Sequence, residues 1–213
     1  RTPEWSVPLV PCKSVPTQAQ LQVAPSFGTT APPAETLASI SWTVVPEAHV
    51  YAFGALRPII NNDSSNSLKQ NQIEMTLDVM ASSLIYWTQD LFQAKLLQKG
   101  SQIFAMTSSG GHRQWKSYGA VSAAKASLES YSRQLALELS EYGIAVNSIQ
   151  AGVTDTPALR KIPENEIMLK RALDLNPGNR LTTPDEVAEI INLFGLSENS
   201  WMTGNTIRVD GGE

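Results

Sequence analysis

Apolar residues are gathered into short runs separated by polar segments from about residue 48 onward. The runs at residues 49–55, 101–107 and 144–149 are apolar at most positions and end near glycine or polar residues. Short apolar runs with such ends are typical of buried strands. A fourth strand is expected in the turn and strand at residues 203–212.

Between these runs the apolar residues recur at helical spacing. Residues 70–98 are predicted to form one long helix that ends at Lys99-Gly100, and about 118–142 a second that ends at Gly143. Their buried faces are expected to carry apolar side chains. In the first helix these are Leu77, Met80, Leu84, Trp87 and Leu91, and in the second Ala123, Ala124, Leu128, Leu135 and Leu139.

Two further helices complete the pattern. Residues 158–175 are expected to be helical, and Thr183 followed by Pro184 predicts the N-cap and first position of another helix. Strands that alternate with helices predict an α/β fold with a parallel sheet flanked by helices. Ligands of such sheets bind beyond the carboxyl ends of the strands, where the loops at 108–111 and 151–157 lie.

The first 46 residues differ from the rest because they contain eight prolines. Proline lacks a backbone donor and fixes φ, which excludes a central strand or a long helix. This segment is interpreted as a linker or tail, as an extended arm laid over a partner, or as a degenerate first βαβ unit. We therefore divide the chain into a Pro-rich segment at 1–46 and an α/β domain at 47–213.

Composition excludes several functional classes. The net charge of −4 and the lack of a basic run argue against nucleic-acid binding. Cys12 is the only cysteine, which favours a reducing compartment, such as the cytoplasm or an organelle matrix or stroma, over secretion. The two histidines, His49 and His112, are far apart, so no metal site is expected. No apolar run reaches the roughly 18 residues needed to span a membrane.

Three residues form the candidate catalytic group. Ser108 follows a strand, Tyr118 begins the next helix, and Lys125 lies seven residues later. Seven residues are almost two turns, so Tyr118 and Lys125 share a helix face about 10 Å apart. A tyrosine can donate a proton, a nearby ammonium lowers its pKa, and a serine hydroxyl can steady the same oxygen. Each also has an ordinary structural interpretation: Tyr118 packing on Trp115, Lys125 in solvent, Ser108 as a polar loop residue.

These residues and their surroundings resemble the short-chain dehydrogenase/reductase superfamily over about residues 48–212. The resemblance includes the helix from Tyr118 through Glu129, the strand around Asn147, the pair Asp155-Thr156 and the ending at 203–212. Val121 stands where most of the superfamily carries its tyrosine, four residues before the lysine. A tyrosine seven residues before the lysine is instead similar to the NADPH-dependent enoyl-acyl-carrier-protein reductases.

The resemblance implies roles for particular residues. Tyr118 would stabilise the enolate formed when hydride reaches the β-carbon of an enoyl thioester, with Ser108 beside it, and Lys125 would bind the nicotinamide ribose. Gly152, Val153 and Thr154 would line the nicotinamide and phosphate side of the pocket, with Thr156 nearby. The cofactor would be NADPH or NADH, and the two long helices would pair across a two-fold axis to build a homo-oligomer.

The dinucleotide-binding half expected by the resemblance is not recognisable. No Gly-x-x-x-Gly-x-Gly turn occurs, and residues 26–30 are the only candidate turn. Met80 stands near the position of an asparagine that the superfamily often uses in proton transfer. The fold is therefore expected to be a truncated or degenerate Rossmann-like sheet. Two functions stay open: an NAD(P)H-dependent reductase, and a non-catalytic subunit of a larger assembly with no cofactor.

Overall fold

The computed structural model describes residues 56–156, 159–161, 165–197 and 199–213. Its sheet has three parallel strands in the order β1 (Gln102–Ser108), β2 (Ala145–Ala151) and β3 (Thr206–Val209). The strands expected at 101–107 and 144–149 are thus confirmed within two residues, and the turn and strand expected at 203–212 contain β3. The Pro-rich segment at 1–46 and the strand expected at 49–55 lie outside the described residues.

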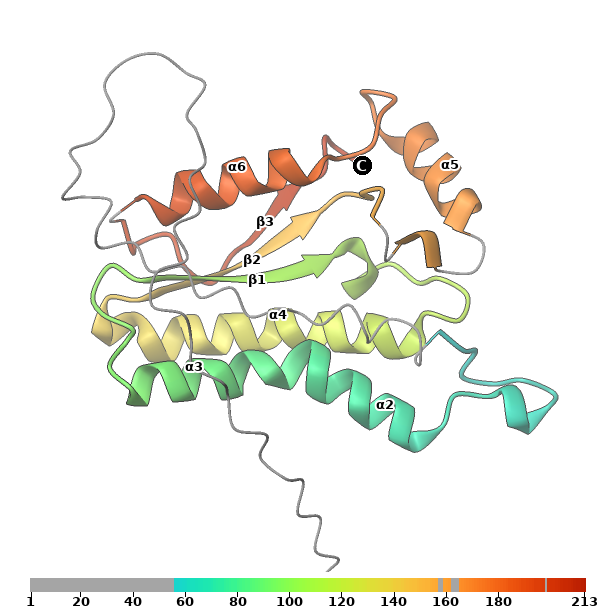
Figure 1. Ribbon diagram of the computed structural model, residues 1–213, viewed down its shortest axis with the longest axis horizontal. Helices are drawn as coiled ribbons and strands as arrows, with labels where there is room; N and C mark the ends of the chain where they lie inside the picture. The colour runs from blue at the N-terminus through green and yellow to red at the C-terminus, as the bar shows by residue number, and fades with distance from the viewer. Residues whose placement is uncertain (1–55, 157–158, 162–164, 198) are drawn as a thin grey trace, which may run out of the picture. The chain divides into compact units, whose positions relative to one another are not determined.

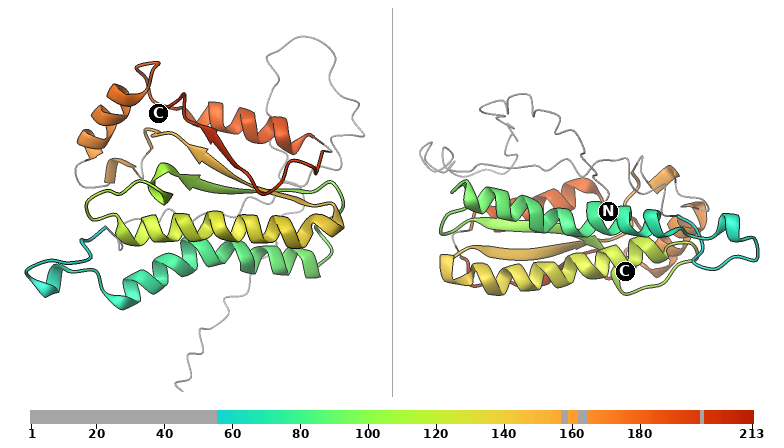
Figure 2. Two further views of the ribbon diagram at one scale, coloured as in Figure 1. Left: turned by 180° about the vertical axis from the view of Figure 1, so that it is seen from behind. Right: turned by 90° about the horizontal axis from the view of Figure 1, so that it is seen from below.

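Helices cover both faces of this sheet (Figures 1 and 2). The helix α4 (Gly119–Leu139) lies along one face, next to the segment α2 (Gln70–Leu77), η2 (Asp78–Ser82) and α3 (Ser83–Gln93), and α6 (Pro184–Gly195) lies on the other face. The remaining helix is α5 (Asn165–Leu175). Short 3-10 turns are η1 (Ser64–Asn66), η3 (Ser109–Gly111), η4 (Ser140–Tyr142) and η5 (Leu159–Lys161).

The core lies between α4 and the strands. Val146 of β2 packs against Leu135 and Leu139 of α4. Farther along the same helix, the small side chain of Ala124 meets Ala105 of β1 and Ala81 of η2. Small residues at this crossing let the helices and strand approach closely, which fixes where the start of α4 meets the end of β1.

The prediction of one helix over 70–98 was wrong in two respects. The helix ends at Gln93, and Lys95 adopts a left-handed conformation with φ 59°. In addition η2 is a π-helical turn, which holds one more residue than an α turn and rotates the face of everything that follows. Trp87 is therefore 45% exposed, and Thr88, only 4% exposed, takes its place in the core.

The other helices follow the sequence more closely. The long helix begins at Gly119 and ends at Leu139, and Gly143 is left-handed as a helix terminator requires, with φ 69°. Ala123 is exposed, so its expected core contact was wrong; it lies on the solvent side of α4. Thr183 caps α6 and Pro184 opens it, as predicted.

In the part of the chain that the structure describes, no helix is long and apolar enough to cross a membrane. The same residues contain no cluster of three or more His, Cys, Asp or Glu side chains arranged to hold a metal ion.

Candidate functional site

Ser108, Tyr118 and Lys125 belong to the end of β1 and the first turns of α4. Ser108 is the last residue of β1, Tyr118 is the N-cap of α4, and Lys125 lies two turns into that helix. The expected loop at 108–111 is the short turn η3 rather than open chain. The arrangement follows from the fold because α4 runs back along β1 and β2 after leaving the carboxyl end of β1 (Figure 1).

Lys125 is held in the body of the protein. Only 8% of it is exposed, and its Nζ donates a hydrogen bond of 2.8 Å to the carbonyl of Met106 in β1. A buried ammonium needs such partners because desolvating a charge is costly. The interpretation of Lys125 as a solvated surface lysine is therefore wrong, and its charge lies close to the end of the strand that carries Ser108.

Tyr118 is partly buried beside the turn η3. Burial raises the pKa of its hydroxyl above the ordinary value of 10.0, and a smaller effect of Ser108 acts in the opposite direction. The expectation that the lysine lowers this pKa was wrong, since desolvation of the phenol dominates. A tyrosine with the ordinary pKa of 10.0 is protonated at neutral pH, and burial reinforces this, so Tyr118 can act as a proton donor.

The Ser108 hydroxyl has an unusual environment. Its Oγ is buried and makes no direct hydrogen bond within the described structure, although it lies close enough to Tyr118 to influence that pKa. A buried hydroxyl without a partner costs free energy, and proteins rarely leave one without a functional or structural reason.

Two residues that sequence reasoning missed hold this turn. Ser122 donates a hydrogen bond to the carbonyl of Gly110, and Glu129 accepts one of 2.7 Å from the hydroxyl of Thr107. With Lys125 they occupy positions three and four residues apart, which is one helix face. Polar residues at this spacing, on a helix face that otherwise carries core residues, could have indicated these contacts from the sequence.

The second loop expected at the site follows β2. Gly152 is packed tightly there, since a β-carbon at this position would contact Thr182 Oγ1 and lie 2.9 Å from Asp210 Cα. The N–H of Val153 donates to Glu213 Oε2 at 2.8 Å. The hydroxyl of Thr154 donates to the Gly152 carbonyl, and that of Thr156 accepts from the N–H of Leu159.

The structure thus brings Ser108 and Tyr118 into direct proximity. It places residues 152–156 after the adjacent strand, at the same edge of the sheet.

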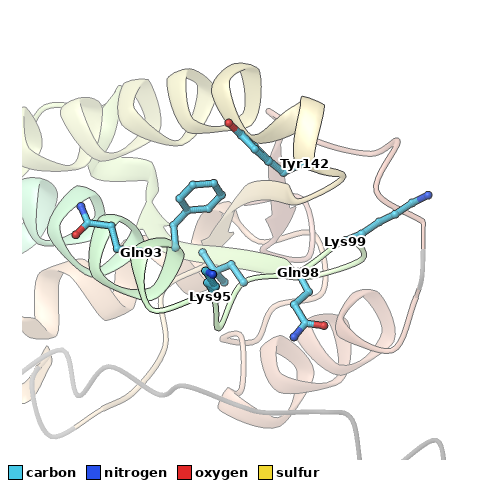
Figure 3. Close-up of a pocket in the computed structure, with 7 residues that line it drawn as sticks. Gln93, Lys95, Gln98, Lys99 and Tyr142 are labelled. Atoms are coloured by element: carbon cyan, nitrogen blue, oxygen red, sulfur yellow. The ribbon is translucent and has the colours of Figure 1, made fainter.

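Two surface hollows contain none of the candidate catalytic side chains. A groove of about 590 Å³ is formed where α3 ends and η4 begins, beyond the amino ends of β1 and β2 and so at the opposite end of the sheet (Figure 3). It is lined by Phe92, Gln93, Lys95, Leu97, Gln98, Lys99 and Tyr142. A second hollow of about 260 Å³ lies beside Asn176, Arg180 and Arg208. Neither contains Ser108, Tyr118 or Lys125.

Comparison with known proteins identifies the relatives of this chain. A family model described as enoyl-(acyl carrier protein) reductase matches residues 48–213. The chain is 34% identical over 120 residues to a 1-cyclohexenylcarbonyl-CoA reductase of Streptomyces collinus, covering 55% of this chain and 43% of that protein. It is 30% identical over 175 residues to a probable 2,4-dienoyl-CoA reductase of Bacillus subtilis, covering 77% and 68%.

Solved structures show the same relationship. The enoyl-[acyl-carrier-protein] reductase (NADH) of Aquifex aeolicus matches with a TM-score of 0.62 and 26% identity, over 68% of this chain and 56% of that one. A Bacillus cereus enoyl-acyl carrier protein reductase, in complex with NADP+ and indole naphthyridinone, matches with a TM-score of 0.61 and 30% identity, over 68% and 55%.

The chain spans less than half the length of the Streptomyces relative and just over half of these two solved chains. A family model that extends over most of the chain, together with a Rossmann-like parallel sheet and the Ser108, Tyr118 and Lys125 arrangement, gives one conclusion. This chain belongs to the enoyl-(acyl carrier protein) reductase family of the short-chain dehydrogenase/reductase superfamily.

Proposed function

We propose that this chain is the catalytic part of an NAD(P)H-dependent reductase that acts on an enoyl thioester. The observation that carries the proposal is the pair formed by the protonated Tyr118 hydroxyl and the buried Ser108 hydroxyl beside it. Two hydroxyl donors at one point suit an oxygen on which negative charge develops. The thioester carbonyl becomes such an oxygen when its conjugated double bond is reduced.

The roles of the residues follow from this geometry. Tyr118 donates a hydrogen bond to the carbonyl oxygen and stabilises the enolate, and Ser108 orients the same oxygen. Lys125 supplies a fixed positive charge near the end of β1 and holds the ribose hydroxyls of the nicotinamide cofactor. When bound, that cofactor supplies the hydride.

We assign Lys125, Gly152, Val153, Thr154 and Thr156 to the nicotinamide and ribose of such a cofactor. For Val153 this requires its N–H to exchange the Glu213 carboxylate for the cofactor. The names of the relatives include both NADH and NADP+, so both NADPH and NADH are candidates.

The test is a fluorescence titration of the purified protein with NADPH and with NADH, followed by assay with a crotonyl thioester. We expect saturable binding that weakens in Lys125→Met, and turnover that falls strongly in Tyr118→Phe with little change in nucleotide affinity. Two variants are matched controls. Lys99→Met removes an ammonium group at the far end of the sheet, and Tyr131→Phe removes a phenol hydroxyl farther along α4. A folded protein that binds neither nucleotide would refute the reductase.

The alternative of a non-catalytic subunit has no observation in its favour among the described residues. The same titration addresses it, because such a subunit would fold normally and bind no nucleotide. In that case the search would turn to the assembly to which the chain belongs.

We further propose that the protein is a homo-oligomer. Large apolar side chains are exposed on the outer helices: Met75 on α2, Tyr86 and Trp87 on α3, and Leu137 on α4. Exposed apolar surface of this kind is typical of an interface. Light scattering of the purified protein measures its mass, and Leu137→Glu should reduce it if α4 takes part in the contact.

A further inference from the structure

The turn that carries Ser108 is fastened to α4 by side chains on one face of that helix. Ser122, Lys125 and Glu129 each bond to a different residue between Met106 and Gly110. We propose that Ser122 is a positioning residue. Its hydroxyl, by holding the Gly110 carbonyl, fixes the position of the Ser108 hydroxyl relative to the Tyr118 ring. This inference rests on the proposed function for its chemical meaning but concerns geometry that can be measured without substrate.

The first step is the contact itself. Ser122 Oγ donates to the carbonyl oxygen of Gly110 over a distance of 2.5 Å, joining residues twelve apart in the sequence. Ser122 also lies one turn after Tyr118, because its own N–H donates to the Tyr118 carbonyl at 2.8 Å. One residue therefore connects the start of α4, which carries the tyrosine, with the turn that carries the serine.

The second step is how closely Gly110 fits against the reactive groups. A β-carbon at position 110 would lie 2.6 Å from Tyr118 Cε1 and 3.2 Å from Ser108 Oγ. Gly110 therefore fills the space beside both groups, and it cannot move toward them. If its carbonyl is released, we expect the turn to move outward, which opens space beside the Tyr118 ring.

The third step concerns Ser108. Its hydroxyl makes no hydrogen bond of its own in the described structure, so its position is set by the residues on either side. On one side Thr107 is tied to Glu129, and Met106 to Lys125. On the other side the side-chain anchor is Ser122. Removing Ser122 thus removes the bond that ties this side of the segment to α4, while the N–H groups of His112 and Arg113 still donate to the Ser109 carbonyl.

The decisive experiment reads Tyr118 in the protein without nucleotide or substrate. In protein labelled with [ζ-13C]tyrosine, the signal that disappears in Tyr118→Phe is that of Tyr118. We expect Ser122→Ala to shift this signal and to lower the pH midpoint of its titration, because the phenol becomes more exposed. Ser122→Thr, which keeps the hydroxyl, should restore both values.

Ser127→Ala is the matched control. It removes a hydroxyl from the same helix whose bond goes to the Ala123 carbonyl one turn back, and the Tyr118 signal should not change. If Ser122→Ala does not fold, Ser122→Cys is used instead, because it keeps the shape and provides only a weak donor. A folded variant with an unchanged Tyr118 signal and titration would overturn the inference.

The kinetic measurement separates this inference from the proposed function. If the reductase is active, Ser122→Ala should lower kcat by roughly 10- to 100-fold with little change in KM, the loss expected when reacting groups are misplaced by about an ångström. Equal kcat in Ser122→Ala and wild type would overturn the role of Ser122. Absence of activity in the wild-type protein would overturn the proposed function alone, and the tyrosine signal would still decide the role of Ser122.

Discussion

Gly110 and Tyr118 are in such close contact that no side chain fits between them. A β-carbon on Gly110 would lie 2.6 Å from Cε1 of the tyrosine ring, well inside van der Waals distance. The φ of Gly110 is not in the left-handed region, so backbone conformation does not demand glycine there. The requirement comes from the site, because a larger residue would push the Ser108 turn away from the tyrosine.

The first prediction follows from this contact. Gly110→Ala should destabilise the protein by about 1–3 kcal/mol, the usual cost of adding a methyl group to a packed site, and should reduce turnover more than nucleotide binding. Urea unfolding and steady-state kinetics measure the two effects. Ser109→Ala changes the neighbouring residue of the same turn without adding atoms, and it should be close to wild type. Normal stability and turnover in Gly110→Ala would show that the turn yields easily.

A second prediction concerns the alkaline side of the stability curve. The pKa of Tyr118 is raised in the folded protein by burial, whereas it is near 10.0 when unfolded. The folded state therefore holds the proton more tightly. The resulting stabilisation is complete below the unfolded pKa and is lost as pH rises through the folded pKa.

Tyr118→Phe should remove this part of the pH dependence. Urea midpoints measured from about pH 9 to about pH 11 should fall less steeply in Tyr118→Phe than in the wild type. Tyr131→Phe removes a hydroxyl from the same helix and serves as the control. An equal flattening in both variants would contradict the assignment to Tyr118.

The layout of the fold was predictable because each signal is local. Apolar runs gave β1 and β2, and Thr183 with Pro184 gave the start of α6. The π-helical turn at η2 could not be predicted, because the apolar residues of this segment recur at the spacing of an ordinary α-helix. Leu84 still packs against the core, but one turn later the buried position is displaced by one residue, which is why Trp87 was expected in the core and Thr88 was not.

The proximity of Ser108 and Tyr118 was predictable from the sequence, whereas the environment of their hydroxyl groups was not. Their places at the end of a strand and at the start of the next helix were enough to bring these two residues together. The direction of the Tyr118 pKa shift depends on how deeply the ring is buried, and the Ser122 bond depends on where the turn after β1 returns to α4. Both are tertiary properties that spacing along one helix does not contain.

A third prediction concerns the start of α6 and the acidic side of the stability curve. Hydrogen bonds from Arg180 and from Thr183 lower the pKa of Glu186 from 4.5 to about 2. A carboxyl whose pKa falls on folding stabilises the protein above its unfolded pKa, and this stabilisation is lost as pH falls toward the folded value. The relevant window therefore lies between 4.5 and about 2.

Glu186→Gln should flatten the pH dependence of unfolding in this window, because glutamine can still accept the capping bond but does not titrate. Glu189→Gln removes an exposed carboxylate from the same helix and is the control. Circular dichroism during urea titration at several acidic pH values measures the difference. Equal slopes in wild type and Glu186→Gln would mean that the Arg180 pair does not persist in solution.

The last prediction concerns the contact between α5 and the segment before Tyr118. The guanidinium of Arg171 lies over the ring of Trp115, 4.9 Å from its centroid, and the Trp115 carbonyl accepts a hydrogen bond from the Tyr118 N–H. A cation over an indole ring contributes about 0.5–1 kcal/mol at an exposed site, so Arg171→Ala should cost about that much stability and alter Trp115 fluorescence. Lys170→Ala, the neighbouring cation, should do neither.

Trp115 is joined to the backbone of Tyr118, so a displacement of Trp115 should also displace the tyrosine. The [ζ-13C] signal of Tyr118 should therefore shift in Arg171→Ala. A fluorescence change with an unmoved Tyr118 signal would show instead that α5 holds Trp115 without influencing the site.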